Sequence, residues 1–475
     1  MPLILPGNVA SATAAVAYSI DNSCRFDGSS AYLQKTFATA TDAKLFTVST
    51  WVKRGNLGDA GAIWSGYHNG SNYITLAFKD DDTLRFQNAS ASVNMHYVTT
   101  RVFRDPAAWY HILAIVDTTD GTAGDRQQIW INGVRETSFS TSTAFGVNAV
   151  PELGATDKEN IVGRDGGDGD YFDGYMAEHF LIDGTAYAAT SFGEFDEDSP
   201  TIWKPIDVSG LTFGNSGYYL DFADSANLGN DANGGTDLDE NGLDATDQAT
   251  DTPTNNFCVM NPLDNYYNSA TFAEGNCKVT TNGSTYAYNT GTVGLSAGLW
   301  YWEVKVTTSE SSNDNLIGIA DKVADATSNY LGEDANAYGL YGYNGDIRNN
   351  GSGSSYGDSY STDVIGVYLD LDNSKLYFAK DGVIMNSGTG VSITAVGSTT
   401  HGFYFPALGD WDSTGSMVVE VNFGNPVSAL SSAVADANGY GNFEYDPSDG
   451  GSASFDGSAK NFLALCTKNL GSDGG

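Results

Sequence analysis

Basic side chains are scarce in this sequence. Its 475 residues include 22 Lys and Arg against 59 Asp and Glu, which gives a formal net charge of −37. Nucleic-acid backbones and anionic membrane surfaces repel a chain with this excess of negative charge, so both are excluded as partners. The charge favours solubility, divalent cations as ligands, or a salty medium that screens repulsion within the chain.

Cysteine is also scarce. The four cysteines are widely scattered and form neither a CxxC pair nor a Cys/His metal spacing: Cys24, Cys258, Cys277 and Cys466. They are too few for a disulfide framework, and we expect buried free thiols.

Long apolar runs are missing as well. No stretch approaches the roughly 18 apolar residues of a membrane span, so membrane insertion is not expected. Residues 1–20 are apolar but have two early prolines and no basic segment, so we do not interpret them as a signal peptide. They are expected to form an N-terminal arm that packs on a neighbour or on the first domain. A protein of this kind would reach the outside of a cell by a route other than secretion.

What the sequence has in abundance is typical of an all-β protein. Hydrophobic residues make up 41%, aromatic residues make up 12%, and there are 56 glycines. The clearest element is residues 364–385, which predict a hairpin with turns at Asn373-Ser374 and Asp381-Gly382. Val367, Leu369 and Leu371 alternate with polar and aromatic positions on the other face. A hairpin with two open edges needs a sandwich around it.

Residues 21–205 predict a first antiparallel β-sandwich built from many short strands. The segments CRFDGSSAYL, FTVSTWVKRG, VFRDPAAWYHILAIVDTT, IWINGV and FDGYMAEHFLIDG occur in this order. Together they resemble the laminin-G-like (concanavalin A-like) domains of tailed-phage proteins, especially those of marine phages. The resemblance implies a concanavalin A-like jelly roll.

Residues 206–270 differ in composition, being rich in Asp, Asn, Gly and Thr and poor in apolar residues. Such a segment cannot build a core by itself and is interpreted as an acidic connector. It resembles the connector of the same phage proteins, so we expect it to be ordered against a domain.

Residues 271–425 predict a second sandwich. GLWYWEVKV, LIGIAD, GVYLDLDNSKLYFAKDG, FYFPALG and NFG follow one another and resemble a SPRY domain. Residues 426–475 resemble the closing C-terminal tail of the same phage proteins. The fold class is therefore two tandem antiparallel β-sandwiches, joined by the acidic connector.

Two acidic stretches are candidate calcium sites, with calcium as the candidate cofactor. Asp237, Asp239 and Asn241, followed by Gly242, fit the first half of a calcium loop, although Gln248 replaces the expected Glu. The second stretch is a glycine-bent loop, which the resemblance to calcium-binding laminin-G-like sandwiches supports; its carboxylates are Asp165, Asp168, Asp170 and Asp173. The alternative is a solvated acidic segment in both places.

Catalytic patterns are absent, so we expect no enzyme. The E-x-D-x-x-E string of concanavalin A-like glucanases does not occur. Gly353-Ser354-Ser355-Tyr356-Gly357 has the letters of a nucleophile elbow but lacks the strand–turn–helix context. The five histidines form no HExxH motif, and no phosphate-binding glycine loop is found.

Loops rich in Tyr, Trp, Asn, Asp and Gly suggest ligand binding by aromatic stacking and polar hydrogen bonds. The same composition suits protein-binding loops. The alternative is that the aromatic residues belong to the core. The candidate ligand-binding residues are Trp64, Tyr67, Tyr341, Tyr343, Asp346 and Trp411.

The resemblance implies a non-enzymatic structural protein of a phage virion, assembled in the host cytoplasm and displayed outside. It would be an exposed tail fibre or head fibre that recognises a host surface glycan or protein. Its partners would include other virion proteins and further copies of the chain, with a trimer as one arrangement. The alternatives are a capsid decoration or anchoring protein without a ligand, and a carbohydrate-active enzyme.

Overall fold

The chain divides into two compact units between Thr254 and Asn255. The computed structural model describes residues 18–36, 38–153, 158–167, 169–265, 267, 269–284, 286–310, 312–411, 415–448 and 455–473. Within these ranges the N-terminal unit extends to residue 254 and the C-terminal unit follows it. Residues 1–17 of the predicted arm lie outside the described residues.

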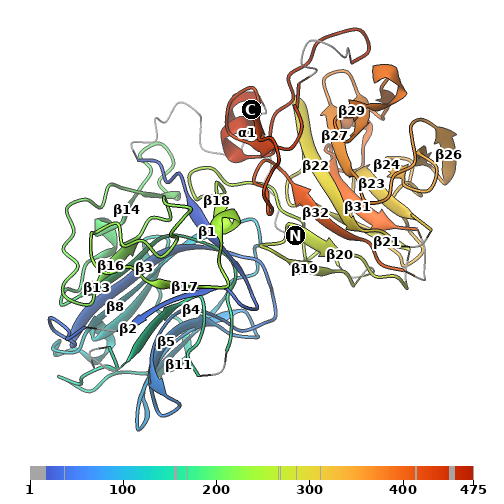
Figure 1. Ribbon diagram of the computed structural model, residues 1–475. Coiled ribbons are helices and arrows are strands. Elements are labelled where there is room, and N and C mark those ends of the chain that lie inside the picture. Colours follow the sequence, from blue (N-terminus) through green and yellow to red (C-terminus); the bar gives the residue numbers. More distant parts are fainter. Residues whose placement is uncertain are drawn as a thin grey trace. The chain divides into compact units, whose positions relative to one another are not determined.

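The N-terminal unit is a sandwich of two eight-stranded sheets whose neighbouring strands are antiparallel (Figure 1). The first sheet has the order β10 (Val134–Arg135), β9 (Gln127–Ile131), β8 (Trp109–Asp117), β3 (Leu45–Arg54), β13 (Asp173–Asp183), β1 (Ser23–Asp27) and β18 (Gln248–Ala249), and β16 (Tyr218–Leu220) pairs with β13. The second has the order β11 (Phe139–Thr143), β7 (Ser92–Val102), β6 (Thr83–Ser90), β5 (Asn72–Phe78), β4 (Gly61–Asn69), β12 (Glu159–Val162), β2 (Tyr32–Thr36) and β17 (Asp239–Asn241). A separate pair is formed by β14 (Gly193–Phe195) and β15 (Trp203–Pro205).

The C-terminal unit is also an antiparallel sandwich. Its larger sheet has the order β19 (Thr271–Ala273), β20 (Lys278–Thr280), β32 (Val418–Asn422), β22 (Leu299–Thr308), β27 (Val364–Asp370), β28 (Lys375–Lys380) and β29 (Val383–Ile384), and β30 (Val391–Ser392) pairs with β28. The smaller sheet has the order β21 (Ala287–Thr290), β31 (Phe405–Asp410), β23 (Asn315–Ala320), β24 (Ala337–Tyr341), β25 (Asp346–Asn349) and β26 (Ser352–Ser355). A short pair is formed by β33 (Val434–Ala435) and β34 (Asn442–Phe443).

Helices are few and short among the described residues. The α-helix is α1 (Thr467–Asp473), and no helix there is long and apolar enough to cross a bilayer. The 3₁₀ turns are η1 (Ala123–Asp125), η2 (Ala189–Ser191), η3 (Ala245–Asp247), η4 (Met385–Gly388) and η5 (Val396–Ser398). The expected fold class of two tandem antiparallel β-sandwiches is confirmed.

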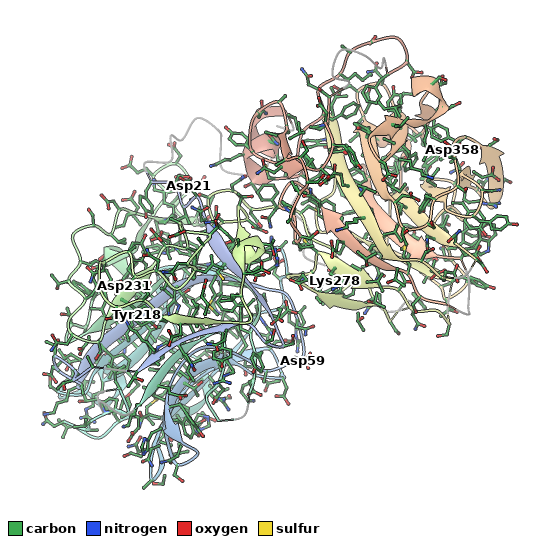
Figure 2. All side chains as sticks on the ribbon, viewed as in Figure 1. Asp21, Asp59, Tyr218, Asp231, Lys278 and Asp358 are labelled. Atoms are coloured by element: carbon green, nitrogen blue, oxygen red, sulfur yellow. The ribbon has the colours of Figure 1, made fainter. Side chains whose placement is uncertain are left out.

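Each sandwich encloses a core of side chains between its two sheets (Figure 2). The predicted alternation of the 364–385 hairpin places Val367 and Leu369 in this core, while Tyr368 faces the opposite side of the sheet. Asp381 and Gly382 both adopt positive φ, at 47° and 76°, as a two-residue turn of this kind requires. Alternation along β27 therefore directs one set of side chains into the core between the two sheets and the other set to the outer face of the larger sheet.

The C-terminal tail covers the outer face of the larger sheet in the C-terminal unit. Phe455 and Phe462 are fully buried against Tyr368 and Tyr377 of the hairpin, and the fully buried Phe443 packs on Tyr301 of β22. The tail is thus a third layer of this sandwich, because the tyrosine face of the hairpin would otherwise be exposed to water.

The acidic connector is not a separate segment. Residues up to 254 pack on the N-terminal unit, where β16, β17 and β18 extend its sheets. A few widely spaced apolar side chains, including Tyr218 and Leu238, enter the core. The buried Asp251 forms an ion pair with the buried Lys53 at 2.6 Å. These few buried side chains are enough to hold the connector on the N-terminal unit, because the sandwich supplies the rest of the core.

Candidate ligand-binding site

Three of the predicted ligand-binding residues lie together at one end of the smaller sheet of the C-terminal unit. Tyr341 ends β24, Tyr343 lies in the turn to β25, and Trp411 directly follows β31. The ring centroids of Tyr341 and Trp411 are 4.9 Å apart, and those of Tyr341 and Tyr343 are 5.9 Å apart. The strand order β31–β23–β24–β25 produces this proximity, since β31 and β24 both flank β23. Asp346 begins the next strand, β25.

Two residues that the sequence did not reveal complete the group. The ring of Tyr330 stacks on Trp411 at 4.5 Å with an interplanar angle of 7°. The guanidinium carbon of Arg348 lies 4.2 Å from the centroid of Trp411 and 4.6 Å from that of Tyr341. Arg348 is the only arginine after Arg164 in the sequence, and this isolation could have marked it as a candidate functional residue. We call the set the aromatic–arginine cluster: Tyr330, Tyr341, Tyr343, Asp346, Arg348 and Trp411.

Exposure within the cluster is uneven. Tyr343 is 63% exposed, whereas Tyr330 and Tyr341 are each 8% exposed. Trp411 is partly covered, with Tyr330 and Arg348 against its ring. The hydroxyl of Tyr341 donates to the carboxylate of Asp314. The available stacking surface is therefore the ring of Tyr343, and the other rings hold it and Arg348 in place.

Polar residues follow Tyr343 in the same turn. The side-chain amide of Asn344 donates to the carboxylate of Asp346 at 2.8 Å, and the amide oxygen accepts from the backbone N–H of Asp346 at 3.1 Å. Burial, followed by Glu333 next to it, raises the pKa of Tyr330 to about 12. Burial and Asp314 also raise the pKa of Tyr341. Both phenols consequently stay neutral near pH 7, and Arg348 supplies the positive charge of the cluster.

The two remaining ligand candidates lie on β4 of the N-terminal unit. Trp64 is fully buried in the core, where its indole N–H donates to the side-chain oxygen of Asn160 at 2.6 Å. It is therefore a core residue and is not accessible to a ligand, which corrects its assignment. Tyr67 is partly exposed and packs beside Gly166 and Gly167. The alternation of side chains along the sequence did not show which of these two β4 residues is a core residue and which is partly exposed.

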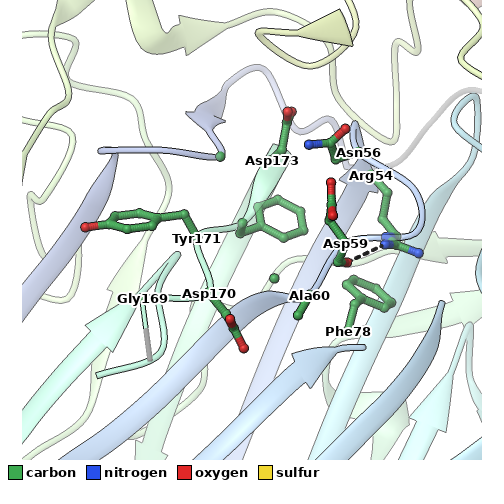
Figure 3. A pocket seen from close by; sticks show the side chains of 12 residues that line it. Arg54, Asn56, Asp59, Ala60, Phe78, Gly169, Asp170, Tyr171 and Asp173 are labelled. Carbon is green, nitrogen blue, oxygen red and sulfur yellow. Dashed lines mark hydrogen bonds between the residues drawn. The ribbon is translucent and has the colours of Figure 1, made fainter. Parts of the chain in front are cut away.

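The N-terminal unit has a pocket of about 270 Å³ at the rim of its sandwich (Figure 3). Its walls come from the turn after β1, the β3–β4 loop and residues 169–173, and its residues are Gly28, Arg54, Asn56, Asp59, Ala60, Gly61, Phe78, Gly169, Asp170, Tyr171, Phe172 and Asp173. Arg54 is engaged by Asp82 at 2.9 Å. In Figure 3 the side chains of Asp170 and Asp173 point away from each other. The pocket is polar and has carboxylates on different walls.

Two family models match the sequence. Residues 27–186 match the Laminin_G_3 model, described as the concanavalin A-like lectin/glucanases superfamily, and residues 299–417 match the SPRY domain. The chain carries a concanavalin A-like domain and a SPRY domain, in that order. The aromatic–arginine cluster belongs to the SPRY domain, and the rim pocket belongs to the concanavalin A-like domain.

Solved structures resemble parts of the chain. A heptameric SAP-like pentraxin from Limulus polyphemus is 17% identical over 36% of this chain and 80% of its own, with a TM-score of 0.28. Domain 4 of AbnA, a GH43 extracellular arabinanase from Geobacillus stearothermophilus in complex with arabinotriose, is 18% identical over 38% of this chain and 78% of its own, with a TM-score of 0.28. A human SPRY domain is 17% identical over 32% of this chain and 92% of its own, with a TM-score of 0.25. No curated protein matches the sequence.

The candidate calcium loop at 165–173 is only partly described. Asp165 is buried and accepts the backbone N–H of Gly167 at 3.0 Å, with Arg85 at 3.8 Å. Asp170 and Asp173 line the rim pocket, and Asp168 lies outside the described residues. No group of three or more His, Cys, Asp or Glu side chains that could hold a metal occurs among the described residues. Calcium at this loop stays a prediction.

The candidate loop at 237–242 has a different local structure from a calcium loop. Asp239 and Asn241 lie on β17, an edge strand of the concanavalin A-like domain paired with β2. Asp237 accepts from the amide of Asn227 at 2.9 Å and from the backbone N–H of Asp231 at 3.0 Å. The carboxylate of Asp237 stabilises the connector through these hydrogen bonds, and residues 239–241 are extended backbone. Calcium at this stretch stays a prediction.

Titratable residues of the described cores have structural partners. His111 and His179 are fully buried, and burial lowers the pKa of each to about 3. His111 contacts Ser49 at 2.9 Å and accepts from the indole of Trp203 at 3.1 Å. Ser355 lies on the exposed edge strand β26 and not on a strand-to-helix turn. The Gly-x-Ser-x-Gly letters therefore lack the geometry of a nucleophile elbow.

Proposed function

We propose that this protein is a non-enzymatic, exposed appendage of a tailed-phage virion that recognises a host surface glycan through the aromatic–arginine cluster. The observation that carries the proposal is the 63% exposed ring of Tyr343, which contacts Tyr341. Arg348 stacks on Tyr341, and Asn344 and Asp346 follow Tyr343 in the turn to β25. An aromatic face next to amide, carboxylate and guanidinium groups provides stacking for a sugar ring and hydrogen bonds for its hydroxyls.

The domain content supports a binding role. One domain matches a superfamily that includes lectins, and the other matches the SPRY family. The virion assignment comes from the resemblance of both domains, the connector and the tail to tailed-phage proteins. Four free, buried cysteines fit assembly in a reducing cytoplasm. Other virion proteins and further copies of the chain are proposed as partners.

Adsorption of the purified full-length protein to host cells tests this proposal. Tyr343→Ala is expected to lower cell binding about fivefold or more, since stacking of a ring on one aromatic side chain contributes about 1–3 kcal/mol, as for nucleic-acid bases. Tyr440→Ala is the matched control, because Tyr440 is a 39% exposed tyrosine of the same unit outside the cluster. Equal loss of binding in both variants, or no binding by the unmodified protein, would contradict glycan recognition at the cluster.

Imaging of the intact particle tests the virion assignment separately. A position on a tail or head fibre supports an appendage that recognises the host. Regular positions on the capsid combined with no cell binding would favour a decoration protein, and absence from the particle would refute a virion role.

A further inference from the structure

Arg348 has an unusual set of contacts for a partly buried arginine. A guanidinium carries five N–H donors, yet Arg348 donates no hydrogen bond from its side chain to any described residue. Among the described residues its buried Nε has no partner, and the nearest carboxylate oxygen, on Asp346, is 4.0 Å away. That separation is too long for a hydrogen bond. The Arg348 side chain is 17% exposed.

The group is nevertheless held in place. Its guanidinium lies over the rings of Tyr341 and Trp411, which restricts its position without using its donors. Two glycines leave room for it. A Cβ at Gly353, its cross-strand neighbour on β26, would lie 2.6 Å from Nη1, and a Cβ at Gly332 would lie 2.6 Å from the Cβ of Arg348. The surroundings thus fit the stacked arginine, and the described residues accept no hydrogen bond from its guanidinium.

We infer that the aromatic–arginine cluster selects acidic sugars, with Arg348 binding a carboxylate or sulfate group of a glycan whose ring packs on Tyr343. This inference rests on the proposed function and specifies its ligand class. A planar guanidinium forms paired hydrogen bonds with such oxyanions, and these bonds are stronger than those between neutral groups. An acidic substituent supplies the acceptors that Arg348 lacks within the described chain.

Because the whole protein is strongly negative, binding of an acidic sugar requires a positive side chain in direct contact with it. A net charge of −37 repels an anionic glycan at long range, and salt at physiological strength screens this repulsion beyond about 8 Å. Recognition of an acidic sugar therefore depends on a short-range cation. Arg348 is the only arginine of the C-terminal unit, and aromatic rings flank it.

Titration calorimetry with three oligosaccharides of equal length tests the inference on the full-length protein. The probes are an oligogalacturonide, a sulfated galactan fragment and a neutral galactan fragment, at matched ionic strength. We expect at least one acidic probe to bind about tenfold or more tightly than the neutral probe. The carboxylated and sulfated probes distinguish the two sources of the oxyanion.

Variants assign the preference to Arg348. Arg348→Gln should abolish it while weak neutral binding remains, whereas Tyr343→Ala should weaken binding of every probe that the protein binds. Lys305→Gln, an exposed cation of the same unit outside the cluster, should leave the preference intact. If Arg348→Gln does not fold, two other measurements test the same point. Gly353→Ala should displace the guanidinium and reduce the preference for acidic probes, and high salt should also reduce this preference.

The outcomes separate the inference from the function on which it rests. Equal affinity of the unmodified protein for acidic and neutral probes would overturn the acidic preference and leave glycan binding intact. A preference that survives in folded Arg348→Gln would overturn the role of Arg348. Cell binding that requires Tyr343 without affinity for any acidic probe would also overturn it, whereas absence of both cell binding and probe binding would refute the proposed function itself.

Discussion

The carboxylate of Glu303, on β22, accepts the backbone N–H of Tyr445, in the C-terminal tail, at 2.8 Å. Its other oxygen accepts the backbone N–H of Glu444 at 2.9 Å. Glu303 is 2% exposed, and the hydroxyl of Tyr301 donates to it as well. These bonds fasten the tail to the central strand of the larger sheet. The tail is therefore part of the folded C-terminal unit, and its loss should destabilise that unit.

Phe462→Ala tests the contribution of the tail to stability. Phe462 is fully buried against Tyr368, with ring centroids 5.1 Å apart, and truncation of a buried phenylalanine costs about 3–5 kcal/mol. Denaturant unfolding of the full-length protein should show this loss in the transition of the C-terminal unit. Val383→Ala, at a position 72% exposed, is the control with little expected effect. Equal stability of the two variants would contradict a packed tail.

Asp251→Asn tests the anchor of the connector on the N-terminal unit. Asp251 pairs with the buried Lys53 and accepts the indole N–H of Trp109 at 3.0 Å. Removing the charge of Asp251 breaks its ion pair with the buried ammonium group of Lys53, and breaking a buried pair costs about 3–5 kcal/mol. The partly exposed pair of Asp125 and Arg135 is the comparison, and Asp125→Asn should cost under about 1 kcal/mol. Similar melting temperatures for both variants would refute the anchor.

Glu178 predicts a dependence of stability on pH. It adopts positive φ (50°) in the middle of β13 and accepts hydrogen bonds from the hydroxyls of Tyr219 and Tyr18 at 2.8 and 3.3 Å. Burial, together with Asp221 and Asp207 nearby, raises its pKa from 4.5 to about 7. Between these values the folded state binds more protons than the unfolded state, so stability falls as pH rises from about 4.5 to 7.

Glu178→Gln should remove this part of the pH dependence, because glutamine mimics the protonated carboxyl. The raised pKa corresponds to roughly 1–3 kcal/mol of stability, which is fully present below about pH 4.5 and lost progressively as pH rises through about 7. Thermal unfolding at pH 5 and pH 8 measures the difference, and the comparison with the variant cancels the general effect of the negative net charge. The same pH slope in both proteins would show that Glu178 does not titrate in this range.

Side-chain alternation predicted the fold more completely than it predicted the site. The faces of β27 follow the period of two, and the turn at Asp381-Gly382 has the positive φ values that its residues favour. These features depend on local sequence. The same reasoning assigned Trp64 to a ligand because a tryptophan near Gly and Asn fits both a core and a rim.

The cluster itself depends on long-range pairing. Tyr341 and Trp411 meet because β24 and β31 flank the same strand, and Arg348 reaches them from the adjacent strand. No local pattern marks Tyr330 as the ring that stacks on Trp411. Burial of the connector also depends on long-range packing, because its few apolar residues are buried only where they pack against the sheets of the N-terminal unit.

The calcium prediction has a direct thermodynamic test. A cation bound to the folded 165–173 loop raises the melting temperature of the N-terminal unit by linkage, so chelator should lower it. Asp173→Asn should remove the response, because Asp173 belongs to the loop and lines the rim pocket. A melting curve unchanged by chelator at matched ionic strength would contradict calcium at either acidic stretch.

A crystal structure of the full-length protein with the tightest-binding of the three oligosaccharide probes tests the central claim most directly. Glycan recognition by the aromatic–arginine cluster predicts a sugar ring against Tyr343, with an oxyanion of an acidic probe within hydrogen-bond distance of Arg348. A sugar bound elsewhere, for example in the rim pocket beside Asp59 and Asp173, with the cluster unchanged, would contradict it.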